Sequence, residues 1–275
     1  MSKSSLNAIE QLQNIMEQLR DPQHGCPWDK QQTFHSVIPH TIEETYEVVD
    51  AIHKQDWPNL REELGDLLFQ VIFYSQLAKE EGLFDFNDVV AEVNDKLVRR
   101  HPHVFGEQHF VTQEELDANW NAQKQREKQS QGIEQQSILD SVPDALPALM
   151  RANKIQKKCS QYGFDWGELE PVVDKVREEL DEVVEEAVQV PNNSERVQEE
   201  VGDLLFSVVN LSRHLGINPE LALGAANHKF VRRFKGVEHH VEQRNKSLSE
   251  CSLSELDGYW NAVKAAEKGQ VSENT

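Results

Sequence analysis

The chain has 275 residues and a formal net charge of −20 at neutral pH, with 38% hydrophobic and 28% charged residues. This length and hydrophobic content suffice for one large domain or two ordinary domains. The negative charge argues against a nucleic-acid backbone or an anionic membrane surface as the main partner. An anionic ligand would therefore need a bound metal ion or a local basic patch.

The cysteines and the N-terminus point to the compartment. Cys26, Cys159 and Cys251 lie far apart and form no CxxC pair, which favours a reducing environment over a disulfide framework. The first residues lack the apolar core of a signal peptide, and no apolar run approaches the roughly 18 residues of a membrane helix. We expect a cytoplasmic protein without a membrane span.

Helical periodicity fills the first half of the chain. Apolar residues recur at helical spacing in residues 6–20, 60–79 and 86–100, and a further short helix is predicted at 114–128. No segment shows the β-branched alternation that is typical of a sheet. The sequence therefore predicts an all-α fold.

One acidic helix lies between the first two of these segments. It carries Glu43, Glu44 and Glu47, and it should begin near Thr41. The reason is Pro39, because proline is tolerated only before a helix or in its first turn.

Residues 129–145 differ in character from the helical segments. They are polar, lack helical periodicity and include Pro143, which indicates a linker. This segment would separate an N-terminal domain, residues 1–128, from a C-terminal domain, residues 146–275.

The second half of the chain repeats four blocks of the first half in the same order. The pairs are 42–49 with 176–184, 62–69 with 199–206, 96–100 with 229–233, and 116–122 with 256–262. A repeat of this size indicates a duplicated domain rather than a solenoid. We therefore predict two tandem helical bundles.

Each copy carries two pairs of acids. In the second copy Glu179 and Glu182 are three residues apart, as are Glu200 and Asp203, so each pair shares a helix face. Two such helices packed together would bring four carboxylates to one point, and clustered hard oxygen donors describe a Mg²⁺ site. The corresponding acids of the first copy are Glu44, Glu47, Glu63 and Asp66. Solvated helix faces are the alternative for any one acidic run.

The second acidic helix of the C-terminal copy is unusual in its apolar surroundings. Its polar positions are Glu200, Asp203, Ser207 and Asn210, at helical steps, and nearly all other positions up to Leu211 are apolar. A helix that is hydrophobic almost all round is normally buried. Acids rarely lie in such a place unless they are paired or bind a metal.

Further side chains could complete the two sites. Glu43 and Glu178 precede the first metal-binding acid of each copy, and they could accept a proton from water or orient the site. The alternative for both is an exposed helix charge. Trp28 and Trp166, ahead of the acidic helices, are interpreted as structural residues.

A basic block follows the acids in each copy. The second copy has Lys229, Arg232 and Arg233, a set suited to phosphate, although pairing with nearby acids is the alternative. Lys96, Arg99 and Arg100 are the counterparts in the first copy. Trp260 and Trp120 offer a flat ring for stacking on a base, or else belong to the core.

The combined pattern resembles the MazG family of all-α nucleoside triphosphate pyrophosphohydrolases. The resemblance rests on the EExxE and ExxD blocks of both copies, on the Cys-Pro-Trp-Asp segment at 26–29 and on the tandem duplication. It implies Mg²⁺-dependent cleavage of a nucleoside triphosphate between its α and β phosphorus atoms, giving the monophosphate and pyrophosphate. It also implies a helical bundle that forms a homodimer, with Mg²⁺ held by the acids of the motif. The sequence leaves room for a regulatory protein partner.

The two copies differ in their basic residues. The second copy has Lys175, Arg177 and Arg196 around its acidic helices, where the first copy has neutral or histidine residues. Lys175 and Arg196 could bind phosphate, so we predict that the C-terminal copy dominates turnover. A non-catalytic helical sensor or adaptor that binds nucleotide is the alternative function. Both copies keep all four acids, which favours the enzyme.

Overall fold

The computed structural model describes residues 7–109, 137–189 and 193–273, together with 112, 115–116, 119–120, 122–123 and 126–127. Over these residues the secondary structure is helical, without strands, so the predicted all-α class is confirmed. The chain forms two compact units, residues 1–133 and residues 134–275. Each unit contains one copy of the repeated blocks.

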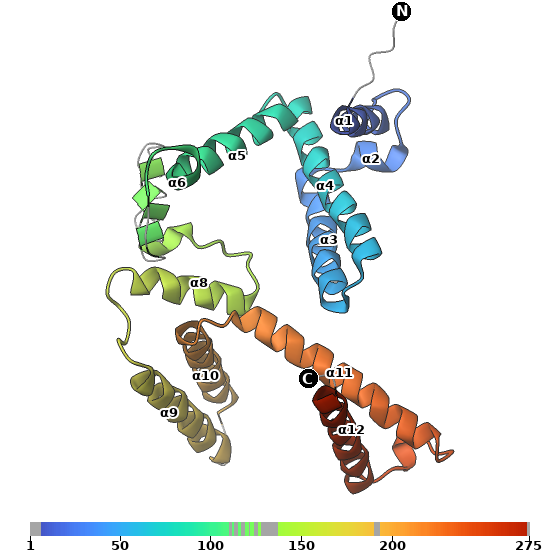
Figure 1. The fold of residues 1–275 in the computed structure, drawn as a ribbon, viewed down its shortest axis with the longest axis vertical. Helices are drawn as coiled ribbons and strands as arrows, with labels where there is room; N and C mark the ends of the chain where they lie inside the picture. The colour runs from blue at the N-terminus through green and yellow to red at the C-terminus, as the bar shows by residue number, and fades with distance from the viewer. Residues whose placement is uncertain are drawn as a thin grey trace, which may run out of the picture. The chain divides into compact units, whose positions relative to one another are not determined.

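The first unit is built around a pair of long helices. Its helices are α1 (Ala8–Leu19), α2 (Pro27–Gln31), α3 (Phe34–Lys54), α4 (Trp57–Glu80), α5 (Phe86–Arg100) and α6 (Pro102–Phe105). α3 and α4 lie side by side, joined by a short turn (Figure 1). Gln55 ends α3 with a left-handed φ of 56°, and the Asp56 side chain caps α4 by accepting a hydrogen bond from the Asn59 amide. The turn thereby brings the acidic faces of the two helices together.

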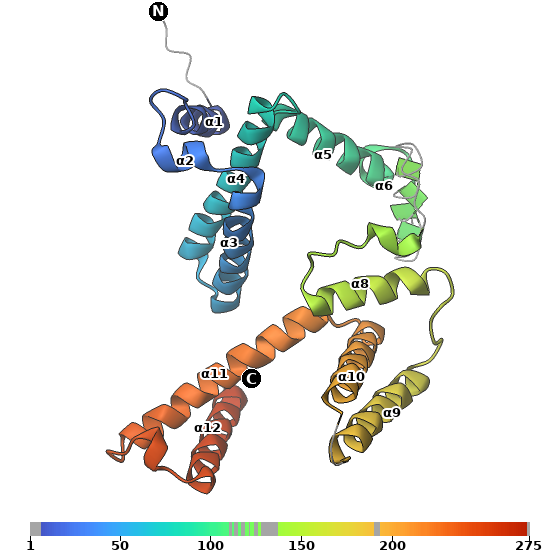
Figure 2. The same cartoon turned by 180° about the vertical axis from the view of Figure 1, so that it is seen from behind.

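The second unit repeats this arrangement. It contains η1 (Ile138–Ser141), α8 (Ala148–Ser160), α9 (Leu169–Val188), α10 (Ser194–His214), α11 (Pro219–Glu242), η2 (Leu248–Glu250) and α12 (Leu253–Glu273). α9 and α10 lie side by side, as α3 and α4 do in the first unit (Figure 2). α8 packs against α10, and α12 packs against α11.

The predicted start of α3 near Thr41 is wrong. The helix begins at Phe34 and contains Pro39. Thr33 and Ser36 exchange hydrogen bonds at its N-terminus, where the Ser36 hydroxyl accepts from the Thr33 amide at 2.8 Å. Val37, which is 1% exposed, anchors the same turns in the core. Cap and core contacts hold the helix although Pro39 removes one backbone donor.

Two predicted segments lie partly outside the described residues. Of the predicted helix at 114–128, the described positions 115–116, 119–120, 122–123 and 126–127 are helical. Of the predicted linker at 129–145, the described part begins at Ser137 and contains the short helix η1.

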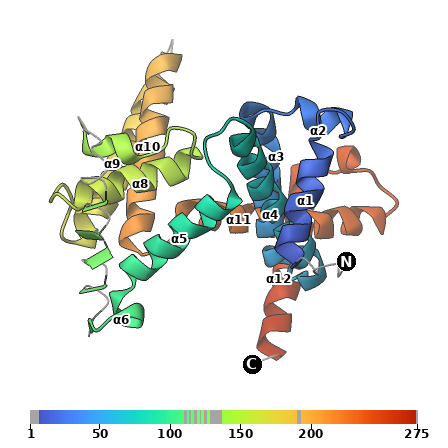
Figure 3. The same cartoon turned by 90° about the horizontal axis from the view of Figure 1, so that it is seen from above.

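The apolar core of the first unit lies between α1, α3 and α4. Met16, Val37, Ile72, Phe73 and Leu77 form it, and all are at most 5% exposed. α1 lies against α4 in this core (Figure 3). In the described part of the second unit, the buried apolar cluster lies instead between α11 and α12, around Val237, Val241 and Tyr259.

None of the described helices is both long enough and apolar enough to span a lipid bilayer.

The packing of Phe73 predicts a large effect on stability. Phe73→Ala should lower the free energy of unfolding of the first unit by about 3–5 kcal/mol, because a ring that is 2% exposed would leave a cavity. Urea denaturation followed by circular dichroism measures this loss. Leu64→Ala, at a position that is 50% exposed on the same helix, is the matched control and should change stability by less than about 1 kcal/mol. Equal losses in the two variants would contradict the assignment of Phe73 to the core.

Candidate functional site

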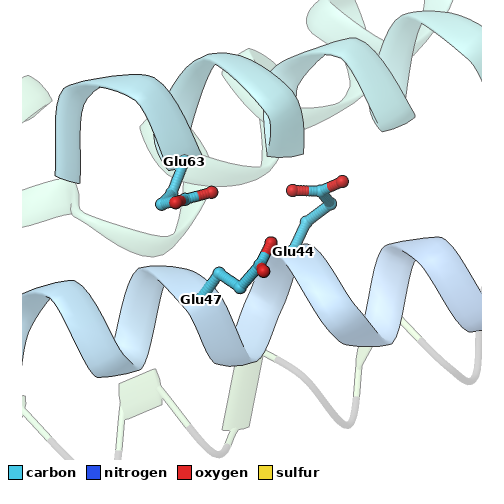
Figure 4. A group of neighbouring side chains, drawn as sticks. All are labelled: Glu44, Glu47 and Glu63. Atoms are coloured by element: carbon cyan, nitrogen blue, oxygen red, sulfur yellow. The ribbon is translucent and has the colours of Figure 1, made fainter. Parts of the chain in front are cut away.

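In the first copy, three acids converge between α3 and α4. Glu44 and Glu47 extend from α3 and Glu63 extends from α4, and their carboxylates point toward one another (Figure 4). One oxygen of each lies within 4.8 Å of one oxygen of each of the others. A spacing of three residues within α3, together with the tight turn to α4, produces this convergence.

The second copy builds the same group deeper in the protein. Glu179 and Glu182 of α9 and Glu200 of α10 again bring oxygens within 4.8 Å of one another. Glu179 and Glu200 are buried, at 5% and 7% exposure. Oε2 of Glu179 is buried without a hydrogen-bond partner. Three clustered carboxylates with an unpartnered buried oxygen fit a divalent cation with oxygen ligands, such as Mg²⁺.

The fourth predicted ligand of each copy lies beside its group rather than within it. Asp66 and Asp203 are not among the oxygens that lie within 4.8 Å of one another. Asp66 nevertheless acts on the first group, because its charge helps to raise the pKa of Glu44. Asp203 lines a cavity together with Glu179. Their role as metal ligands stays a prediction.

Desolvation and charge repulsion raise the pKa of a carboxyl group in each of the two groups of acids. Partial desolvation raises the pKa of Glu44, and the charges of Asp66, Glu47 and Glu63 raise it further. The pKa of Glu182 is likewise raised, first by desolvation and then by the charges of Glu179 and Glu200. A cation placed between the carboxylates would offset the repulsion that helps to raise the pKa of Glu44 and of Glu182.

Two cations flank the acids in the second copy. Nζ of Lys175 lies 2.7 Å from Glu179 and 2.8 Å from Glu178. Nη2 of Arg196 lies 2.8 Å from Glu200. Hydrogen bonds to Glu178 and Glu179 raise the pKa of Lys175, so this side chain stays protonated.

The first copy lacks such cations at its acids. Among its described residues, no lysine or arginine forms an ion pair with Glu44, Glu47 or Glu63. The most similar contact in the first copy is made by His40, whose Nδ1 lies 3.9 Å from Oε2 of Glu43. The difference in flanking charge between the copies, predicted from the sequence, is therefore present in the structure.

A cavity of about 460 Å³ opens beside the acids of the second copy. Such a volume falls within the range of small-molecule sites, roughly 300–1,000 Å³. Apolar side chains from α8, α9 and α10 form much of its wall, and Glu179, Asp203 and Lys175 lie at its polar side. Trp166 also lines it and is 45% exposed, so the prediction of a structural Trp166 misses its place at the cavity.

The wall of the cavity differs from the first copy at one aligned position. Phe73, seven residues after Asp66, corresponds to Asn210, seven residues after Asp203. Phe73 belongs to the apolar core of the first unit, whereas Asn210 lines the cavity of the second. The two copies thus share their acids but differ in a side chain beside them.

The α10 helix is only partly buried, contrary to expectation. Three residues of its polar stripe face inward: Glu200, Ser207 and Asn210 are at most 8% exposed, whereas Asp203 is exposed. Its apolar residues include Leu205 and Val208 at 53% and 41% exposure. Glu200 is thus buried, while much of the apolar side is left uncovered within the described chain.

The basic blocks lie on α5 and α11 and have acidic partners. Arg232 and Arg233 both pair with Glu267 of α12, through Nε at 3.0 and 2.8 Å. In the first copy Arg99 and Arg100 both pair with Glu127. These contacts follow the alternative in which the basic block pairs with acids. No described contact joins Lys96 or Lys229 to the carboxylate groups.

The two tryptophans near these blocks pack on their neighbours. The Trp260 ring lies 5.2 Å from the Phe230 ring and contacts the Arg233 guanidinium. The Trp120 ring lies against the rings of His101 and the guanidinium of Arg100. Both follow the alternative of a packed tryptophan, and their role in stacking on a base stays a prediction.

The sequence analysis did not predict that three buried polar residues line a pocket. Gln156, Ser207 and Asn210 line the cavity and are at most 8% exposed. For Ser207 and Asn210 a signal existed, because they continue the polar stripe of Glu200 and Asp203 along α10. Gln156 has no comparable signal in the sequence.

Known proteins are similar to this chain over most of its length. The family model described as MazG nucleotide pyrophosphohydrolase domain matches residues 32–105 and 168–238, one segment in each copy. A nucleoside triphosphate pyrophosphohydrolase of Escherichia coli strain K12 is 53% identical, over 95% of this chain and 99% of that protein. A nucleoside triphosphate pyrophosphohydrolase/pyrophosphatase MazG of Thermotoga maritima is 42% identical, over 94% and 97%. The crystal structure of a mazG-related protein from Thermotoga maritima aligns with 42% of this chain and 98% of its own, at 29% identity and a TM-score of 0.37.

The repulsion within the carboxylate groups yields a prediction about stability. Glu44→Gln should raise the melting temperature of the metal-free protein by roughly 2–4 °C, because it removes one of the mutually repelling charges. Added Mg²⁺ should raise the melting temperature of the wild type more than that of the variant. Thermal denaturation with and without Mg²⁺ measures both effects. Glu92→Gln, an exposed change on α5, is the control and should behave like the wild type.

Proposed function

Because this chain belongs to the MazG family, we propose that it is a nucleoside triphosphate pyrophosphohydrolase that uses Mg²⁺. It would cleave the triphosphate between the α and β phosphorus atoms and release a nucleoside monophosphate and pyrophosphate. One observation carries the proposal: the carboxylate group between α9 and α10 adjoins a cavity of small-molecule size, and Glu179 belongs to both.

The proposed placement of the substrate follows from this shared residue. A nucleoside in the cavity would carry its triphosphate past Glu179 and Asp203, toward Glu182 and Glu200. These four acids are the proposed Mg²⁺ ligands of the C-terminal site. Bound Mg²⁺ would neutralise the triphosphate, polarise the α-phosphoryl group and lower the pKa of an attacking water.

Lys175 and Arg196 would change partners when the site fills. They now neutralise Glu179 and Glu200. Once those carboxylates turn to a cation, the ammonium and guanidinium groups become available to phosphate oxygens, for which both are suited. The same two side chains would therefore stabilise the empty site and bind the substrate.

Glu178 is the proposed base for the attacking water. It is exposed, adjacent to Glu179 in the chain, and held by Lys175. Loss of its Lys175 partner on substrate binding would free it to accept a proton. Glu43 occupies the equivalent position in the first copy, where His40 is its neighbour.

The basic block of α11 is proposed to hold the departing pyrophosphate. Arg232 and Arg233 now share Glu267, an arrangement that a phosphate group can replace. Lys229, one turn away on α11, would add a third positive charge.

The C-terminal copy is proposed as the working site. It combines acids, flanking cations and a cavity, whereas the first copy has Phe73 of its apolar core at the position where Asn210 lines the cavity. The first copy would then serve as a scaffold that keeps its metal-binding acids, Glu44, Glu47, Glu63 and Asp66. The three cysteines are free, in agreement with the reducing cytoplasm proposed as its location.

Incubation with a panel of ribo- and deoxyribonucleoside triphosphates plus Mg²⁺ tests the reaction. The proposal predicts monophosphate and pyrophosphate in equal amounts. Release of orthophosphate would mean that another bond is cut. Binding without any hydrolysis would favour the alternative of a nucleotide sensor or adaptor.

The proposed assignment of the working copy gives a prediction. Glu179→Ala combined with Asp203→Ala should lower kcat/KM at least about 100-fold, because the substrate loses its cation ligands. Glu44→Ala combined with Asp66→Ala should retain most of the activity. Pyrophosphate release measures both double variants. The hypothesis fails if the first pair leaves the rate intact and the second abolishes it.

We further propose that the protein forms a homodimer through the apolar side of the acidic helices. Leu205 and Val208 of α10, and Leu180 and Val184 of α9, are 41–53% exposed. Exposed apolar patches of this kind on long helices are typical of protein–protein contacts. A second copy of the chain would cover them and bury the α10 helix as its sequence predicts.

The dimer proposal leads to a measurable change in mass. Wild-type protein should have twice the mass of one chain in light scattering after gel filtration. Leu205→Glu should shift it toward the monomer, because a charge would be placed in the contact. Leu253→Glu, at an apolar position that is 83% exposed on α12, is the control and should leave the dimer intact. A monomeric wild type would contradict the proposal.

A further inference from the structure

Gln156 presents a hydrogen-bond acceptor that the protein leaves unused. This side chain lines the cavity of the second copy and is 8% exposed. Its Nε2 donates to the Phe206 carbonyl at 2.8 Å, which fixes the orientation of the amide. Its Oε1 is then buried and has no hydrogen-bond partner. A buried carbonyl without a partner is costly, so a donor from a ligand would be favoured here.

Asn210 lines the same cavity, but here the protein pairs with the amide oxygen rather than with the amide N–H groups. Its Oδ1 accepts two hydrogen bonds from Arg213, from Nε at 3.1 Å and from Nη2 at 2.8 Å. Arg213 is in turn held by Asp165. The amide oxygen of Asn210 is thereby occupied, and its N–H groups are left for an acceptor. The cavity therefore offers one fixed acceptor and one fixed donor.

The Asn210 position differs between the two copies. Phe73 stands at the equivalent position of the first copy and belongs to its apolar core. An apolar side chain packs there, so the Asn210 amide is not required by the fold. The presence of two amides beside a cavity points to a ligand with polar edges rather than to packing.

We propose that Gln156 binds an N–H group of the nucleobase, with Asn210 donating to a neighbouring acceptor of the same base. The proposal rests on the proposed function and names the part of the substrate that the cavity recognises. Adenine and cytosine carry an exocyclic N–H donor beside a ring acceptor, whereas guanine and uracil carry an exocyclic acceptor beside a ring N–H donor. A fixed acceptor–donor pair of amides therefore matches adenine and cytosine in one orientation of the base, and a base that lacks an N–H group leaves the acceptor unpaired.

Synthetic nucleotides without a base N–H group test the role of Gln156. ATP is compared with purine riboside triphosphate, and CTP with 2-pyrimidinone riboside triphosphate, under saturating Mg²⁺. The triphosphate is the same in each pair, so the bond that is cut does not change. For the wild type, kcat/KM should be about 10- to 100-fold lower with the analogues, because Oε1 stays unpaired.

The variant and its control locate the effect. Gln156→Met, which removes the amide and keeps a side chain of similar length, should bring the ratio of the kcat/KM of ATP to that of its analogue close to one. Gln70→Met is the matched control, because Gln70 also has a buried Oε1 without a partner but does not line the cavity. It should keep the wild-type ratio. Melting curves show whether each variant folds, and Gln156→Leu replaces Gln156→Met if that variant does not.

The outcomes separate this inference from the proposed function. Equal kcat/KM values for ATP and its analogue in the wild type would mean that water serves Oε1, and the inference would be wrong while the enzyme assignment stands. Discrimination that persists in Gln156→Met would place recognition on another residue and overturn the inference as well. If no triphosphate yields pyrophosphate, the proposed function fails, and the inference fails with it.

Discussion

Repulsion between carboxylates held at close range is the constraint on which the site depends. Two helices joined through a tight turn bring Glu44, Glu47 and Glu63 together, and each raises the free energy of the others' charged form. Helix packing elsewhere must hold them there. In the first unit the core of α1, α3 and α4 supplies that packing, through side chains such as Phe73. The metal-free fold thus holds a cluster of negative charges that a bound cation would stabilise.

The two duplicated units differ in the side chains that surround their clustered acids. The first has an apolar core next to its acids and no lysine or arginine paired with them among the described residues. The second places Lys175 and Arg196 on its two buried acids, and a cavity lies beside these acids. The two cations are 35% and 51% exposed, so their ion pairs contribute little to stability. Their charges instead offset those of Glu179 and Glu200.

The sequence allowed the fold class and the carboxylate groups to be predicted, because both follow from local spacing. Acids three residues apart share a helix face in any context. The start of α3 was mispredicted since its cap at Thr33 and the core contact of Val37 outweigh the local effect of Pro39. The cavity could not be predicted at all. It depends on which side chains from α8 and α10 meet, and that is a property of tertiary packing.

The α10 helix links the site to association. Its sequence is mostly apolar, yet polar residues are among those buried within the chain, with Glu200 at 7% exposure and Leu205 at 53%. Such a helix gains little hydrophobic stabilisation from its own unit, because its apolar side is not removed from water there. A partner that covers this side would supply the missing stabilisation to the same helix that carries Glu200 and Asn210. Association would then fix the position of α10, and with it the positions of Glu200 and Asn210. The geometry of the site and the assembly of the protein would both depend on this one helix.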